Sequence, residues 1–138
     1  MCDIQFRFAG PVLGSPDPHR LAEFYHHLLG WQIRHTETAG VDGATDDWAM
    51  LVSPEGSAKV EIQFEPTFEP PVWPAQPGRQ QMLQHLDFGV ADLDEAVEVA
   101  LGFGATLESH QPLPDVQVMR DPAGHIFCLF ADPEMRSS

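Results

Sequence analysis

The chain contains two similar segments, and this duplication strongly limits the folds that it can form. The first begins at Asp17-Pro18-His19 and closes at Leu29-Gly30-Trp31. The second begins at Asp92-Leu93-Asp94 and closes at Phe103-Gly104-Ala105. Each follows a short β-like run and leads into further strand-like runs. A duplication of this size predicts a pocket built from two related halves.

Residue spacing predicts the order βαβββ in each half. Asp17 and Asp92 are expected to cap one helix each, and apolar residues then recur at helical spacing until a glycine ends the pattern. Ile4, Phe6 and Phe8 alternate with polar residues, which predicts a first strand. The other expected strands are 31–36, 48–53 and 58–64 in the first half, and 82–90, 105–108, 116–120 and 125–130 in the second.

The expected organisation is a single domain covering residues 1–138. It consists of a module at 4–64, a linker at 65–81 and a module at 82–132. The linker is assigned from its many prolines and glycines, which are typical of a connection rather than of a buried element.

Composition narrows the possible partners. Twenty-one acidic and seven basic residues give a formal charge of −14, which argues against nucleic acid and acidic membrane surfaces and permits a cationic ligand. No stretch approaches the roughly 20 apolar residues of a membrane span. Cys2 and Cys128 are the only cysteines. They provide no disulfide framework, which favours a reducing cytoplasm.

Several motifs give the chain a family resemblance. His85-Leu86-Asp87-Phe88 lies just before the second helix start, and Arg120-Asp121-Pro122-Ala123-Gly124 precedes the last expected strand. With Leu29-Gly30-Trp31, these motifs resemble the vicinal oxygen chelate superfamily of glyoxalases, bleomycin-resistance proteins and extradiol dioxygenases. The resemblance covers about residues 4–132. It implies an α+β fold in which two βαβββ modules form an open, cup-shaped mixed sheet with helices outside, and it implies a homodimer.

The resemblance also implies a place for a metal. Metal-using members carry four ligands, from the first and last strand of each module. The corresponding positions here are read as Gly10, Gln63, His85 and Cys128, which lack both expected carboxylates. The sequence therefore favours an incomplete metal site and no cofactor. Glu61 and Glu65 share the strand face of Gln63 by alternation, and a shift of two residues would offer a carboxylate. His85, Gln63 and Glu61 would then form a site for Fe, Mn, Ni or Zn.

Two functions stay open. The first is a binder of a small organic molecule in an aromatic-lined cup, similar to bleomycin-resistance proteins. The second is a metal-dependent lyase, isomerase or dioxygenase that acts on a vicinal-oxygen substrate, so whether the chain is an enzyme is left open. The candidate ligand-binding residues are His85, Gln63, Trp48, Trp73, Asp87 and Cys128. Trp73 is expected to act as a lid or to pack across a dimer interface.

Overall fold

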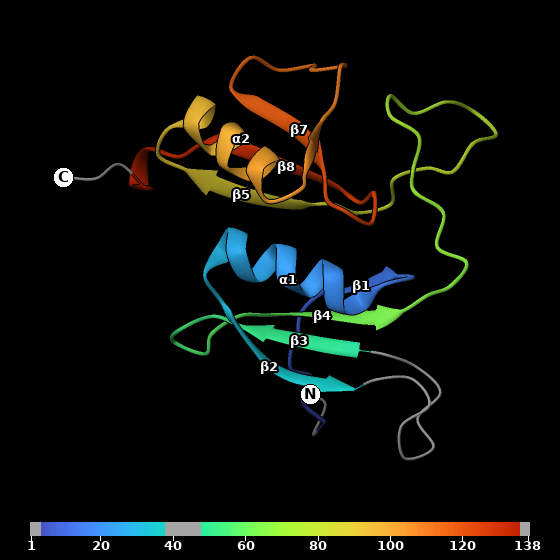
Figure 1. The fold of residues 1–138 in the computed structure, drawn as a ribbon, viewed down its shortest axis with the longest axis vertical. Helices are drawn as coiled ribbons and strands as arrows, with labels where there is room; N and C mark the ends of the chain where they lie inside the picture. The colour runs from blue at the N-terminus through green and yellow to red at the C-terminus, as the bar shows by residue number, and fades with distance from the viewer. Residues whose placement is uncertain (1–3, 38–47, 136–138) are drawn as a thin grey trace. The chain divides into compact units, whose positions relative to one another are not determined.

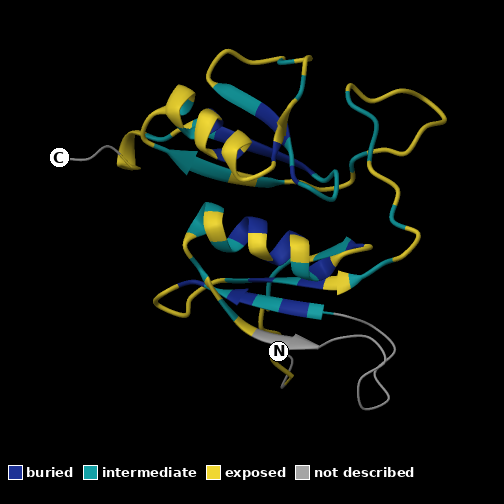
Figure 2. Ribbon diagram, in the orientation of Figure 1, coloured by how far each residue is buried: buried dark blue, intermediate teal, exposed yellow. Residues whose placement is uncertain are grey.

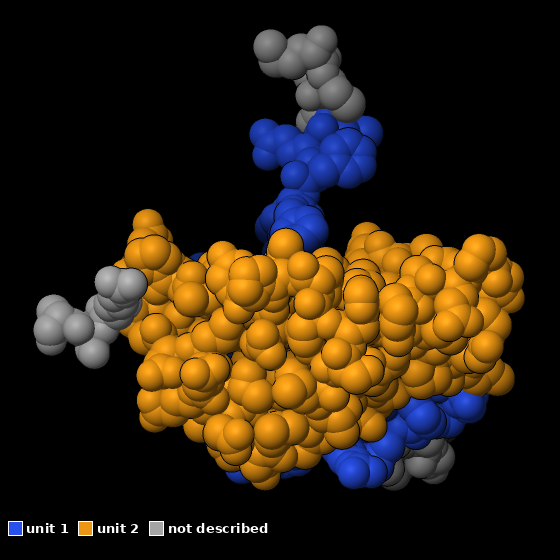
Figure 3. All heavy atoms as spheres, turned by 90° about the horizontal axis from the view of Figure 1, so that it is seen from above, with its two compact units in different colours: residues 1–66 blue, residues 67–138 orange. Residues whose placement is uncertain are grey.

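The structure is a computed structural model that describes residues 4–37 and 48–135. The chain divides into two compact units, residues 1–66 and 67–138 (Figure 3). Each unit contains a βαβββ module with one mixed four-stranded sheet (Figure 1). The expected α+β fold of two βαβββ modules is therefore confirmed. Neither helix in the described ranges has the length and hydropathy needed to cross a membrane.

Unit 1 consists of β1 (Val12–Ser15), α1 (Pro18–Leu29), β2 (Gln32–Glu37), β3 (Trp48–Val52) and β4 (Lys59–Phe64). The strands lie in the order β1-β4-β3-β2. β1 is parallel to β4, and the other neighbours are antiparallel.

Unit 2 repeats this order. It consists of β5 (Leu86–Val90), α2 (Leu93–Gly102), β6 (Thr106–Leu107), β7 (Val116–Arg120) and β8 (Ile126–Ala131), followed by a short 3-10 helix, η1 (Pro133–Met135). The strands lie in the order β5-β8-β7-β6, with β5 parallel to β8.

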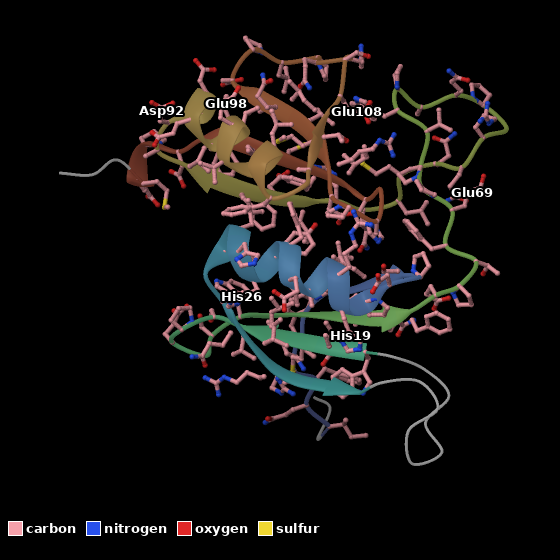
Figure 4. The ribbon with its side chains drawn as sticks, viewed as in Figure 1. His19, His26, Glu69, Asp92, Glu98 and Glu108 are labelled. Atoms are coloured by element: carbon pink, nitrogen blue, oxygen red, sulfur yellow. The ribbon has the colours of Figure 1, made fainter. Side chains whose placement is uncertain are left out.

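The helix ends agree with the capping residues expected from the sequence. The Asp17 carboxylate accepts a hydrogen bond from the Arg20 amide at 3.2 Å, and the Asp92 carboxylate accepts one from the Glu95 amide at 3.0 Å. Asp92 is labelled in Figure 4. Such caps satisfy amide groups that have no partner within the helix. Gly30 then ends α1 in the left-handed conformation, at φ 71°.

The strand expected at Ile4–Phe8 is wrong. The first strand of unit 1 is Val12–Ser15, and none of the described strand pairings includes residues 4–9. The register explains why. Val12 pairs with Glu61 in a parallel ladder, and β4 begins at Lys59. An extension of β1 toward the N-terminus would therefore pass the first residue of β4 and have no strand to pair with. The sequence pattern at residues 4–8 is nevertheless that of a strand.

The core of unit 1 lies between α1 and one face of its sheet (Figure 2). Alternate residues of β3 and β4 are buried, and the residues between them are on the opposite face. This alternation leaves the second face of the sheet open to polar side chains. The buried core residues are Leu21, Phe24, Tyr25, Ala49, Leu51, Val60 and Ile62.

Unit 2 buries both faces of its central strand β8, whose residues Ile126–Leu129 are all buried. Val97 and Ala100 of α2 are buried, and α2 contacts β8. Val118, Ile126 and Cys128 form a separate cluster. The segment at 65–81 does more than link the modules, because its Trp73 packs against this cluster.

Candidate functional site

A cavity of about 400 Å³ opens in unit 1 on the sheet face away from α1. β4 supplies most of its wall, and Trp48 at the start of β3 supplies an aromatic surface. Trp48 pairs with Gln63 in the antiparallel β3–β4 ladder, which places the two residues side by side. The lining residues are Val12, Trp48, Glu61, Ile62, Gln63, Phe64 and Glu65.

Two carboxylates give this cavity a negative character. The Glu61 carboxylate accepts a hydrogen bond from Lys59 Nζ at 3.0 Å and is paired with that cation. The Glu65 carboxylate accepts one from the neutral amide of Gln63, at 2.7 Å. Among the described residues, these contacts set one cation against two carboxylates, so the electrostatics disfavour an anionic ligand.

Strand alternation had placed Glu65 on the same strand face as Glu61 and Gln63, although Glu65 was not chosen as a ligand-binding candidate. Glu65 follows the last residue of β4, and the cavity extends to it.

Unit 2 holds a second group of polar residues, His85, Asp87 and Cys128. Their candidate ligand atoms all lie within 4.8 Å of one another. His85 Nε2 lies 3.1 Å from Asp87 Oδ1. The two residues are two positions apart, which is the spacing of side chains on one face of an extended chain. Parallel pairing of β5 with β8 then sets Asp87 opposite Cys128.

Burial and charge both act on the Cys128 thiol. Desolvation of the buried side chain raises the pKa of Cys128 above its ordinary value of 9.0, and the nearby Asp87 carboxylate raises it further. Both effects disfavour the thiolate. The thiol is therefore protonated at neutral pH, and Cys128 packs as a small hydrophobic residue.

The two halves can be compared through their strand registers. Val12 lies five residues before the N-cap Asp17, and Asp87 lies five residues before the N-cap Asp92. Val12 pairs with Glu61, whereas Asp87 pairs with Cys128. Glu61 is therefore the structural counterpart of Cys128. This correspondence matches the two-residue shift from Gln63 to Glu61 that the sequence left open.

Gly10 remains the counterpart of His85, because each lies two residues before these paired positions. Gly10 has φ 129°, and a Cβ atom there would lie 2.6 Å from the Lys59 carbonyl oxygen. The first module therefore has a backbone conformation at this position that disfavours any side chain, including a metal ligand.

Trp73 belongs to unit 2. Its indole N–H donates a hydrogen bond to the His110 carbonyl at 2.9 Å, and its ring packs against the cluster containing Cys128. In the described residues Trp73 is thus a packing residue beside Cys128, and Trp48 is the tryptophan that lines the cavity of unit 1. Of the candidate metal ligands, Glu61 and Gln63 belong to unit 1 and His85 belongs to unit 2.

Two further polar residues, His26 and Arg120, have structural roles. His26 of α1, labelled in Figure 4, is half-buried, and its Nδ1 lies 2.6 Å from the Trp31 carbonyl oxygen, just beyond the helix end. Arg120 pairs with Glu108 and donates to the Gly124 carbonyl at 3.0 Å. Arg120 therefore serves a local ion pair.

Residues 11–130 match the family model of the glyoxalase-like domain. The chain belongs to the glyoxalase-like domain family. The match covers both βαβββ modules, and it places the chain in the vicinal oxygen chelate superfamily, as the sequence motifs indicated. No curated protein sequence shows a significant match.

Solved structures of this superfamily have the same fold. A glyoxylase/bleomycin resistance protein/dioxygenase domain from Frankia sp. EAN1pec is 20% identical, with a TM-score of 0.61, covering 93% of this chain and 98% of that one. A fosfomycin resistance protein, FosX, from Listeria monocytogenes is 12% identical, with a TM-score of 0.70 and 94% of each chain covered. That structure contains Mn(II) and 1S,2S-dihydroxypropylphosphonic acid.

A trypanothione-dependent glyoxalase I from Leishmania major is 18% identical, with a TM-score of 0.65, covering 95% of this chain and 90% of that one. Identities this low establish a common fold, and a fold of this kind carries many activities. The activity of this glyoxalase-like chain therefore depends on its own site residues.

Proposed function

We propose that this glyoxalase-like protein binds a small organic molecule in the cavity of unit 1. The main observation that supports this proposal is the cavity itself. Its volume of about 400 Å³ lies within the range of small-molecule sites. Its wall combines aromatic and apolar surface from Trp48 and Phe64 with the polar groups of Glu61, Gln63 and Glu65. This mixture gives a ligand both contact area and a fixed orientation.

The charge of the wall favours a neutral or cationic ligand. In the described part of the chain, the carboxylates of Glu61 and Glu65 contact one cation, Lys59, and one neutral amide, Gln63. Trp48 adds an aromatic face, which attracts a cation held against it. The binder needs no metal in this cavity, because the polar side chains that line it provide the orienting groups.

Isothermal titration of the full chain tests the proposal. Benzyltrimethylammonium serves as a small aromatic cationic probe, and 1S,2S-dihydroxypropylphosphonic acid serves as an anionic one. We expect binding of benzyltrimethylammonium, a weaker affinity in the Trp48→Ala and Glu65→Gln variants, and little binding of the phosphonate. Glu55→Gln is the matched control, because Glu55 is an exposed carboxylate outside the cavity. Equal affinities in the Glu65→Gln and Glu55→Gln variants would contradict the proposal.

A metal-dependent lyase, isomerase or dioxygenase is the second candidate, and the His85–Asp87–Cys128 group favours it. One nitrogen, one carboxylate oxygen and one sulfur within 4.8 Å of one another are a donor set that suits Zn²⁺ with an open fourth position. A bound Zn²⁺ supplies Lewis-acid polarisation of a substrate oxygen. The chain's own part is to hold the ion and to release the Cys128 proton, which the raised pKa opposes at neutral pH.

Metal analysis separates the two candidates. The protein is purified without chelators or an affinity tag, equilibrated in turn with Mn, Fe, Co, Ni and Zn, and then washed. The binder proposal predicts no stoichiometric ion and no change in metal content in the His85→Ala variant. A retained ion that is lost on His85→Ala would instead support the metal enzyme.

The same proposal extends to partners and location. We infer that the chain is a cytoplasmic homodimer that acts on a small molecule and binds neither nucleic acid nor membranes. The formal charge of −14 supports the absence of nucleic-acid and membrane partners. A sequence with only two cysteines, which form no disulfide framework, supports the cytoplasmic location.

A further inference from the structure

Glu65 follows the tip of β4, where the chain leaves the sheet (Figure 1), and it is held in place by β1. Its backbone amide donates a hydrogen bond to the Ser15 carbonyl at 2.9 Å, just beyond the last pair of the parallel β1–β4 ladder. A Cβ atom at Gly14 would lie only 2.7 Å from the Glu65 Cγ atom. Glycine at position 14 therefore leaves the space that the half-buried Glu65 side chain occupies.

Unit 2 repeats this arrangement but uses the carboxylate differently. Asp132 follows β8, and its amide donates a hydrogen bond to the Val90 carbonyl at 2.8 Å. A Cβ atom at Gly89 would lie 2.6 Å from the Asp132 Oδ2 atom, so a glycine again makes room for an acidic side chain. The Asp132 carboxylate accepts a hydrogen bond from the Glu134 amide at 3.0 Å. The acidic residue of unit 2 therefore caps the short helix η1.

Glu65 cannot cap a helix in the same way. Pro66 follows it and has no amide hydrogen, and the next element of the described chain is a strand, β5. The Glu65 side chain instead lines the cavity of unit 1, where its carboxylate accepts a hydrogen bond from the Gln63 amide at 2.7 Å. A carboxylate has about four acceptor positions, so Glu65 can also accept hydrogen bonds from a ligand.

The two carboxylates of the cavity differ in how far the protein offsets their charge. Glu61 lies 3.0 Å from Lys59 Nζ, and this ion pair offsets its charge. In the described part of the chain, the contact of the Glu65 carboxylate is with a neutral amide, which leaves its charge for a ligand. Trp48 lies opposite Gln63 in the β3–β4 ladder, so an aromatic side chain lines the same cavity as Glu65.

We propose that the ligand of this cavity is a protonated primary or secondary amine that carries an aromatic group. Its N–H donates a hydrogen bond to the Glu65 carboxylate, and its aromatic group packs against Trp48. A hydrogen bond between two charged groups is about twice as strong as one between neutral groups, which is the basis of the selection. This inference rests on the proposed function, because it uses the same cavity, and it adds the chemical class of the ligand and the residue that recognises its charge.

Isothermal titration of the full chain with benzylammonium and benzyltrimethylammonium tests the ligand class. Both probes carry the same ring and the same charge, but only benzylammonium can donate an N–H hydrogen bond. The ratio of their two dissociation constants, compared between proteins, removes the difference in their hydration. We expect the preference for benzylammonium to fall about 10-fold or more in Glu65→Gln. Glu55→Gln, a change of an exposed carboxylate outside the cavity, should leave the preference unchanged.

Gly14→Ala supplies a second variant, which displaces the Glu65 side chain without removing its charge. We expect the dissociation constant of benzylammonium to rise about 5- to 10-fold. Gly89→Ala is the matched control, because it introduces the same kind of clash with Asp132 in unit 2, away from the cavity. It should leave the affinity unchanged. Circular dichroism establishes that both variants fold.

The outcomes separate this inference from the proposed function. If the unmodified protein binds neither cation, the proposed function fails and this inference fails with it. If both cations bind and Glu65→Gln leaves the preference for benzylammonium unchanged, the cavity still binds a ligand but the ligand class proposed here is wrong. Equal dissociation constants in folded Gly14→Ala and Gly89→Ala variants would overturn the role of Glu65.

Discussion

Asp87 and Cys128 lie opposite each other in the parallel β5–β8 pair, with the Asp87 carboxylate within 4.8 Å of the Cys128 sulfur. The two residues are far apart in the sequence, and only the register of the sheet brings them together. Desolvation contributes most to the raised pKa of Cys128, and the charge of Asp87 adds to it. The charge contribution can be removed without altering the buried position of the thiol.

Asp87→Asn should therefore lower the pKa of Cys128, because a neutral amide no longer repels the thiolate. The pKa should stay above its ordinary value of 9.0, since the burial that is its main cause remains. The ultraviolet absorbance of the thiolate against pH measures this pKa, in a Cys2→Ser background that removes the other thiol. An unchanged titration would show that the carboxylate does not act on the thiol.

Cys128 should also make the protein less stable in alkali. Above pH 9.0 the unfolded thiol loses its proton, whereas the folded thiol, with its raised pKa, keeps it. The unfolded state then binds fewer protons, so the free energy of unfolding falls as the pH rises. Urea unfolding at several pH values should show a shallower alkaline decline for Cys128→Ala than for the unmodified protein. Parallel declines would argue against this effect.

Asp121 should be important for the turn before β8. Its buried Oδ1 accepts hydrogen bonds from the amides of Ala123, Gly124 and His125, each at 3.0 Å. Asp121→Ala leaves these amides without that acceptor and should lower the free energy of unfolding by about 3 kcal/mol. Asp121→Asn, which keeps one oxygen, should cost less.

Denaturant unfolding measures both changes at Asp121. The exposed Asp115 provides the control, since Asp115→Ala should change the stability by about 0.5 kcal/mol or less. A similar loss in Asp115→Ala and Asp121→Ala would mean that the turn network contributes little.

Gly10→Ala should destabilise unit 1 for two reasons, backbone strain and a steric clash of the new Cβ atom. The φ of 129° is strained for alanine, and the new Cβ would lie 2.6 Å from the Lys59 carbonyl oxygen. We expect a loss of about 2–4 kcal/mol in the free energy of unfolding. Gly56 also has a positive φ, of 79°, but a Cβ there meets open space. Gly56→Ala should therefore cost only about 1–2 kcal/mol in the same denaturant titration.

Helices, turns and the family were predictable from the sequence, because their signals are local. Asp17 and Asp92 cap their helices through amides only three residues away. A capping residue, an apolar stripe and a closing glycine therefore specify a helix without reference to the rest of the chain.

Tertiary structure decided the features that depend on a neighbouring strand. Ile4, Phe6 and Phe8 have the alternation of a strand. β4 begins only at Lys59, so it has no residues opposite them. The register also made Glu61, not Gln63, the counterpart of Cys128, since a strand pattern repeats every two residues and does not by itself select the partner. Trp48 and Trp73 were both candidate ligand-binding residues from the sequence. Tertiary packing places Trp48 in the wall of the unit 1 cavity and Trp73 against the Cys128 cluster. A helix closes its hydrogen bonds within its own segment, whereas strands, cavities and clusters depend on residues that are distant in the chain.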